Sequence, residues 1–332
     1  MWLINIHSLE LELFVGNRIP EYAILSHRWG DKEASFEKFQ SRQYDSREGG
    51  YGKIWDFCAQ VAEGKGSINY AWVDTCCIDK RSSAELSESI NSMFKWYRDA
   101  QICYVYLSDV DGQAPDIESE LRKSQWFLRG WTLQEIVAPR EILFFSKTWT
   151  LLGSKSKLVD IISSITKIER DYLLDEKPLY QASIAQRMSW ASCRSTTREE
   201  DIAYSLLGIF DISMPLLYGE GTKAFIRLQE EILKQTKDDS ILAWGYNLPR
   251  NCAFHQGLDH QFHILGALAQ HPSWFAGCGS VVQCGIWEVL DHWSRSLEIT
   301  NKGLHIRATD SDSTIINQQP DTMSTTAFKK HY

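Results

Sequence analysis

Four short apolar segments alternate with segments of helical periodicity, and this alternation constrains the fold more than any other feature of the sequence. The apolar segments read YAILS, YAWVDT, ICYVYL and EILFF, at residues 22–26, 70–75, 102–107 and 141–145. Strands that alternate with helices form a parallel sheet with helices on both faces. We therefore predict an α/β fold with a flavodoxin-like parallel sheet flanked by helices.

The helices between these strands are marked by apolar residues at helical spacing. One covers residues 54–61, where apolar residues recur at positions i, i+3, i+4 and i+7. The next begins with a capping box formed by Ser82 and Glu85 and carries one apolar stripe as far as Tyr97. A third, short helix covers residues 131–138 and leads into the last strand.

The chain divides into four parts. Residues 1–150 hold the predicted sheet, with its motifs at 20–140, and residues 151–240 form a helical segment packed on it. Residues 241–315 form a smaller β-rich region. The polar tail, 316–332, lacks the apolar surface that would offset the entropy of ordering, and we expect it to be disordered. Helices of the second part are predicted at 158–165, 184–191, 199–210 and 225–233, and strands of the third at 241–244, 280–283, 296–299 and 304–307.

Composition excludes several classes of protein. The net charge is −8 and no basic block occurs, which argues against nucleic acid as the main partner. No apolar run approaches the ~20 residues that span a bilayer, and the first residues lack the basic start of a signal peptide. The eight cysteines form no CxxC pair, so we expect a reducing, cytoplasmic location. The motifs of P-loop, Rossmann, zincin and α/β-hydrolase enzymes are absent.

Polar residues cluster where the predicted strands end. The clusters are residues 26–30, 74–79 and 108–111. In open α/β sheets, ligands bind outside the carboxyl ends of the strands. We therefore expect a binding site at this edge of the sheet.

The segment SQWFLRGWTLQEIVAP, residues 124–139, supplies the main candidate carboxylate. Its predicted helix has one apolar face, so the pattern places Gln134 and Glu135 on the other side. A carboxylate beside aromatic side chains is a common setting for a raised pKa and a functional role. The competing interpretation is a solvated helix residue, or an ion-pair partner of Arg129 or Arg140.

Other candidates also have a structural alternative. His27 can be a satisfied structural histidine, and Asp74 or Asp79 can hold a turn instead of binding a metal or ribose. Cys76 and Cys77 have no neighbouring histidine to activate them, so buried cysteines are the default. No metal site is predicted, because the one metal-like cluster matches no zinc pattern; it comprises Cys252, His255, His260 and His263.

Three segments of the chain resemble the fungal heterokaryon incompatibility (HET) domain. They are YAILSHRWG (22–30), AWVDTCCIDK (71–80) and WFLRGWTLQEIVAP (126–139), in the family's order and spacing. Residues 219–244 resemble the region that often follows a HET domain, and Lys80 stands where glutamine is frequent. The resemblance implies a role in fungal non-self recognition, in which incompatible fusion triggers regulated cell death.

HET domains are in turn similar to TIR domains, which implies a TIR-like fold and cleavage of NAD or a related nucleotide. Residues 131–135 can be aligned with the W-C-L-x-E helix of TIR domains, which puts Glu135 on the catalytic glutamate. Cleavage of the nicotinamide–ribose bond passes through an oxocarbenium-like state that one carboxylate can stabilise. The implied nucleotide-binding residues are Ser26, His27, Arg28, Trp29, Gly30, Asp74, Asp79 and Trp131.

No cofactor is implied. The implied partners are an NAD-type substrate and either a second copy of the chain or another incompatibility or sensor protein. The alternative function is a non-catalytic module that signals by self-association, with the tryptophan segment as its interface. A single cleft containing Glu135 and both strand-end clusters would favour the enzyme.

Overall fold

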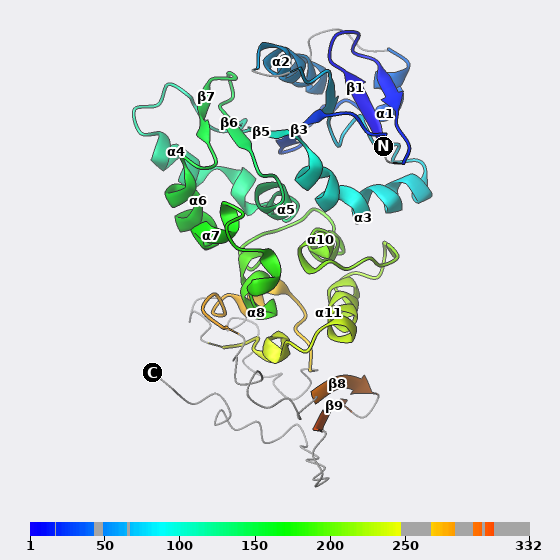
Figure 1. Ribbon diagram of the computed structural model, residues 1–332, viewed down its shortest axis with the longest axis vertical. Coiled ribbons are helices and arrows are strands. Elements are labelled where there is room, and N and C mark those ends of the chain that lie inside the picture. The colour runs from blue at the N-terminus through cyan, green and yellow to red at the C-terminus, as the bar shows by residue number, and fades with distance from the viewer. Residues whose placement is uncertain are drawn as a thin grey trace.

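The fold is built on a seven-stranded sheet with the order β2-β1-β4-β3-β5-β6-β7. The computed structural model describes residues 1–16, 18–42, 49–64, 67–246, 267–282, 295–300 and 303–308, and Figure 1 shows its elements. The strands are β1 (Trp2–Asn5), β2 (Leu11–Leu13), β3 (Tyr22–His27), β4 (Tyr70–Trp72), β5 (Ile102–Tyr106), β6 (Ile142–Phe145) and β7 (Leu151–Ser154). The four predicted strands are all present and form the centre of the sheet.

The sheet is mixed, so the prediction of a wholly parallel sheet is wrong at both edges. The central strands β4, β3, β5 and β6 are parallel. At one edge β1 is antiparallel to β4 and β2, and at the other β7 is antiparallel to β6. Antiparallel neighbours need only a tight connection, whereas parallel ones need a crossover. The few residues between β1 and β2, and between β6 and β7, are therefore enough to connect these antiparallel pairs.

Helices cover both faces of the parallel centre. α2 (Gly50–Glu63) connects β3 to β4, and α3 (Ser83–Asp99) connects β4 to β5. Since β4 and β5 lie on opposite sides of β3, right-handed connections place α2 and α3 on opposite faces, as Figure 1 shows. α5 (Thr132–Val137) packs against α3 and β3. The other helices here are α1 (Phe36–Gln40), α4 (Ile117–Lys123) and the 3-10 helix η1 (Gln125–Leu128).

The start of α3 fixes the loop that follows β4. The Ser82 hydroxyl accepts a hydrogen bond from the Glu85 backbone N–H, as the capping box predicts. The Glu85 carboxylate does not complete the box; it accepts a hydrogen bond from the backbone N–H of Asp79. The helix is held to the sheet by aromatic packing, with the rings of Trp72 and Tyr97 centred 5.9 Å apart. The strand-end cluster at residues 74–79 is thus tied to the start of α3.

A helical region follows the sheet, as predicted. It contains α6 (Val159–Thr166), α7 (Arg170–Leu173), α8 (Ile184–Trp190), α9 (Asp201–Tyr204), α10 (Leu207–Phe210) and α11 (Lys223–Gln235). The helix predicted at 199–210 is two helices, and the break follows Ser205, whose hydroxyl donates to the Ile202 carbonyl. α10 packs closely on α3: a Cβ on Gly208 would lie 2.0 Å from the Cβ of Phe94.

Two strands predicted for the C-terminal part are wrong. Asp239–Leu242 form a 3-10 helix (η3), so the strand predicted at 241–244 is wrong. Residues 280–282 form no strand. The strands predicted at 296–299 and 304–307 are confirmed as the antiparallel hairpin of β8 (Arg295–Thr300) and β9 (Gly303–Ala308).

Two predictions fall outside the described residues: the disordered tail at 316–332 and the cysteine–histidine cluster at 252–263. Within the part of the chain that the structure describes, no helix has the length and apolar character needed to cross a membrane.

Candidate functional site

Glu135 lies inside the protein, not on the polar face that the helical pattern predicted. All six residues of α5 are buried, Gln134 included, and Glu135 is only 7% exposed. The helix is enclosed by α3, α7, η1 and β3. The apolar pattern marked one buried face correctly, but the prediction for the other face is wrong because neighbouring elements cover it as well.

The Glu135 carboxylate faces the end of β3. Its Oε2 accepts a hydrogen bond from the Ser26 hydroxyl, and Ser26 Oγ accepts one from Trp126 Nε1 at 2.9 Å. Burial raises the pKa of Glu135 to about 7; the charge of Asp74 adds to the rise, and the Ser26 hydrogen bond, Arg129 and Arg194 oppose it. Near neutral pH this carboxyl is poised between its protonated and ionised forms.

The segment around Glu135 is anchored from the helical region. The buried Arg194 donates to the Arg129 carbonyl and to Thr132 Oγ1, both at 2.9 Å. A Cβ on Gly130 would lie 2.5 Å from Thr196 Cγ2, so only glycine lets these two segments approach so closely. At the other end of α5, the buried Lys155 donates to the Pro139 carbonyl. The position of Glu135 is therefore set by backbone anchors on both sides.

A second group of charges, partly exposed, lies around the buried His27. Its Nε2 is 3.5 Å from Glu33 Oε2 and its Nδ1 is 3.9 Å from Asp74 Oδ1. Neither ring nitrogen has a hydrogen-bond partner among the described residues. Lys53 Nζ binds Glu33 Oε1 at 2.7 Å. Burial and the charge of Lys53 lower the pKa of His27, whereas the carboxylates of Glu33 and Asp74 oppose this shift.

The pKa of Glu33 shifts in the opposite direction to that of Glu135. Burial alone would raise it, but the contacts with His27 and Lys53 lower it to about 2. Glu33 also accepts a hydrogen bond from the Gly30 backbone N–H at 2.6 Å. An ionised carboxylate thus holds the loop after β3 in place.

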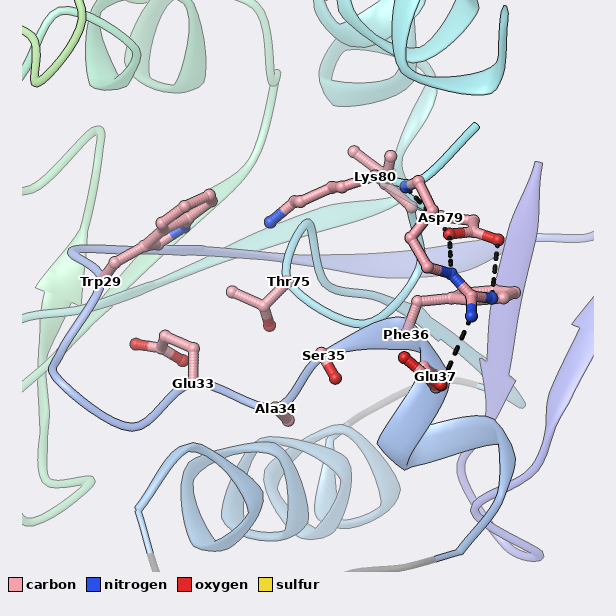
Figure 2. Close-up of a pocket in the computed structure, with 11 residues that line it drawn as sticks. Trp29, Glu33, Ala34, Ser35, Phe36, Glu37, Thr75, Asp79 and Lys80 are labelled. Atoms are coloured by element: carbon pink, nitrogen blue, oxygen red, sulfur yellow. Dashed lines mark hydrogen bonds and ion pairs between the residues drawn. The ribbon is translucent and has the colours of Figure 1, made fainter. Parts of the chain in front are cut away.

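A pocket of about 160 Å³ opens between the loops after β3 and β4 (Figure 2). Trp29 forms one wall, and its Nε1 donates to Asp74 Oδ2 at 2.7 Å. The Lys80 amine lies 3.8 Å from the centre of the Trp29 ring, in cation–π contact. The lining residues are Trp29, Glu33, Ala34, Ser35, Phe36, Glu37, Thr75, Ile78, Asp79, Lys80 and Arg81.

The structure brings most of the predicted site residues together, but not into one cleft. Trp29 and Asp79 line the pocket, whereas Glu135 does not. The charge of Asp74, which accepts the Trp29 hydrogen bond, acts on Glu135 and so links the pocket to the buried carboxyl. Trp131 is elsewhere: its Nε1 lies 3.4 Å from Asp201 of α9.

The remaining predicted residues lie at the end of β3 and in the loop that follows it. Ser26 and His27 are buried at the end of β3, and Arg28 and Gly30 are exposed in the loop that follows. No sequence signal marks Glu33 or Lys53, which lie on a loop and on α2 without motif spacing. Thr75 belongs to the predicted cluster 74–79 and Lys80 to the segment 71–80, but the pattern assigned neither of them a role. Within the described ranges, no group of three or more metal-binding side chains is placed to hold a metal ion.

Two parts of the chain match known family models. Residues 22–117 match the family model described as heterokaryon incompatibility protein (HET), and residues 223–298 match a domain of unknown function (DUF8212). The chain is similar to the vegetative incompatibility protein HET-E-1 of Podospora anserina, with 48% identity over 235 residues. That match covers 68% of this chain but only 17% of the relative. No solved structure matches the chain.

Proposed function

Because this chain carries a fungal HET domain, we propose that it acts in non-self recognition and regulated cell death by cleaving NAD or a related nucleotide. The observation that carries the chemistry is the environment of Glu135. A buried carboxyl with a pKa of about 7, at the carboxyl end of parallel strands, is typical of a catalytic group.

The order of the central strands supports a TIR-like, flavodoxin-like fold for this domain. Numbered from β3, the four parallel strands lie in the order 2-1-3-4, which is the order of the first four strands in flavodoxin-like sheets. In such sheets the switch point lies between the first and third strands, here β3 and β5. Ser26 is paired with Val105 at this point and holds the Glu135 carboxyl.

The reaction needs one carboxylate beside the ribose. Breaking the bond between nicotinamide and ribose develops positive charge on the sugar, and an ionised Glu135 stabilises that charge. The nicotinamide ring of NAD is itself cationic and lowers the pKa of a neighbouring carboxyl. Substrate binding would therefore complete the ionisation of Glu135. Nicotinamide leaves with the electron pair of the broken bond and needs no acid catalyst; water then adds to the ribose carbon, which gives ADP-ribose and releases one proton to solvent.

Access to Glu135 requires a movement of the loop after β3. Trp29, a wall of the pocket, donates a hydrogen bond to Asp74, and Asp74 is close enough to Glu135 for its charge to act on that carboxyl. Trp29 is 45% exposed, so its release costs little packing. We propose that the nucleotide displaces this contact on binding.

The alternative, a non-catalytic module that self-associates, would need a surface other than the tryptophan segment. Trp126 is buried, and Trp131 is held by Asp201. A second copy or another incompatibility protein in the cytoplasm remains the proposed partner in either case, since the relative is itself an incompatibility protein.

Consumption of NAD by the purified protein at high concentration tests this proposal. The wild type should release nicotinamide, and Glu135→Ala should not. A folded wild type that leaves NAD intact, even when it is crowded enough to self-associate, would refute the enzyme and favour the module. Equal turnover by both proteins would refute the role of Glu135.

A further inference from the structure

The charged residues that line the pocket are paired, with one exception. Glu33 binds Lys53, and Arg81 binds both Asp79 and Glu37. Within the described ranges, Lys80 has no carboxylate oxygen within 4.0 Å, and its contact is the face of Trp29. The pocket therefore holds one cation whose charge no carboxylate neutralises by direct contact.

Thr75 adds an unused hydroxyl to the same pocket. The residue is 3% exposed, and its Oγ1 has no hydrogen-bond partner among the described residues. Figure 2 shows Lys80 extending toward Trp29, with Thr75 beside the space that they bound. A buried hydroxyl without a partner costs stability. Its presence in a pocket wall beside an unpaired ammonium points to a ligand that satisfies both.

We infer that Lys80 and Thr75 form a phosphate subsite, with Trp29 as the stacking surface for the attached heterocycle. A phosphate oxygen accepts hydrogen bonds from an ammonium and a hydroxyl together, and such charge-assisted bonds are the strong ones. The amine of Lys80 then leaves the Trp29 ring, and the freed ring face is available to a base. Lys80 thus covers the stacking surface until a phosphate draws it away.

The size of the pocket limits what it holds. Pockets that enclose a whole drug-sized ligand measure roughly 300–1,000 Å³, and this one measures about 160 Å³. It therefore takes a phosphate and one ring, and the rest of a dinucleotide extends toward Asp74 and Glu135. The identity of the ligand as a nucleotide rests on the proposed function, whereas the subsite rests on Lys80, Thr75 and the pocket itself.

Calorimetric binding of ADP-ribose tests the inference separately from catalysis, because this ligand has no nicotinamide bond to cleave. Lys80→Met should weaken ADP-ribose binding by roughly tenfold or more, as expected for a lost charge-assisted contact. Adenosine, which has no phosphate to draw Lys80 away from the Trp29 ring, should bind Lys80→Met no more weakly than the wild type. Lys157→Met is the matched control, because Lys157 is exposed and does not line the pocket.

Thr75→Val supplies a second test with a different readout. The variant should bind ADP-ribose several-fold more weakly, while the free protein unfolds at the same or a higher temperature, because an unsatisfied hydroxyl has been removed. A lower unfolding temperature would mean that the hydroxyl is structural and would overturn its assignment.

The remaining outcomes are equally decisive. Undiminished ADP-ribose binding by Lys80→Met, an equal loss in Lys157→Met, or no binding by the wild type would overturn the subsite. Inorganic phosphate that binds as tightly as ADP-ribose would overturn stacking on Trp29. Phosphate-dependent binding by a wild type that never cleaves NAD would refute the proposed function and leave the subsite standing.

Discussion

Glu135→Gln is expected to stabilise the protein at pH 8 and to have little effect at pH 5. The buried carboxyl has its pKa raised from 4.5 to about 7. Between these values the unfolded chain has released the proton while the folded chain still holds it, so the free energy of unfolding falls as pH rises. The difference between 7 and 4.5 is about 2.5 pKa units; at ~1.4 kcal/mol per unit, the protein loses about 3 kcal/mol across this window and does not regain it above pH 7.

Glutamine should remove this loss. Its amide cannot ionise, and its oxygen still accepts a hydrogen bond from the Ser26 hydroxyl. A neutral acceptor is weaker than a carboxylate, which costs about 1 kcal/mol. The variant should therefore be more stable than the wild type by about 2 kcal/mol at pH 8.

Urea unfolding followed by tryptophan fluorescence at several pH values between 5 and 8 measures this difference. Glu230→Gln, at an exposed position of α11, is the control for removal of one carboxyl. If Glu135→Gln is less stable than the wild type by the same margin at pH 5 and pH 8, the reasoning is refuted. The carboxylate would then be held by Arg129 or Arg194 as a stabilising ion pair.

Three further predictions concern the supports of the site. Gly208→Ala should destabilise the protein by about 1–3 kcal/mol through overpacking against Phe94, which a lower unfolding temperature would show. Gly279→Ala is the control and should leave the unfolding temperature unchanged, because its Cβ would meet only Ser189 Oγ, at 3.7 Å. Burial lowers the pKa of Lys155 from 10.5 to about 8, so between these pH values the unfolded chain binds a proton that the folded chain has released. The free energy of unfolding of the wild type should therefore gain a contribution from Lys155 between about pH 8 and pH 10.5. Lys155→Met should lack this rise, and the same pH profile in both proteins would contradict the prediction. Ser26→Ala removes the hydrogen bond that holds down the pKa of Glu135. In the same urea titration the loss of stability should begin at the same pH as in the wild type but continue to a higher pH; a loss that ends at the wild-type pH would show that the bond does not matter.

The central sheet was predictable because its strands have a local signature. Each is a short run of buried apolar residues, as in β3, where all six residues are buried. The edge strand β7 has no such signature. β7 reads LLGS and is half-exposed, and its pairing with β6 depends on contacts that its own sequence does not specify.

The surroundings of α5 show where local pattern stops being informative. Periodicity identified an apolar face, but the burial of Gln134 and Glu135 depends on α3, α7 and β3, which come from distant parts of the chain. The residues of the candidate site were likewise predictable only where a local pattern marks them. Ser26 and Asp74 were found because strand ends in α/β sheets are known positions, whereas Lys53 reaches Glu33 from the side of α2, and no motif marks it.

The pH dependence of nicotinamide release tests the central claim most directly. If the ionised carboxyl of Glu135 stabilises the oxocarbenium-like state, the rate under saturating NAD should rise with pH to a plateau. Because the bound cationic ring lowers the pKa of this carboxyl, the apparent pKa should lie at or below about 7. Glu135→Gln should bind ADP-ribose and release no nicotinamide at any pH. A wild-type rate that does not change with pH, or release by Glu135→Gln at the wild-type rate, would contradict the account.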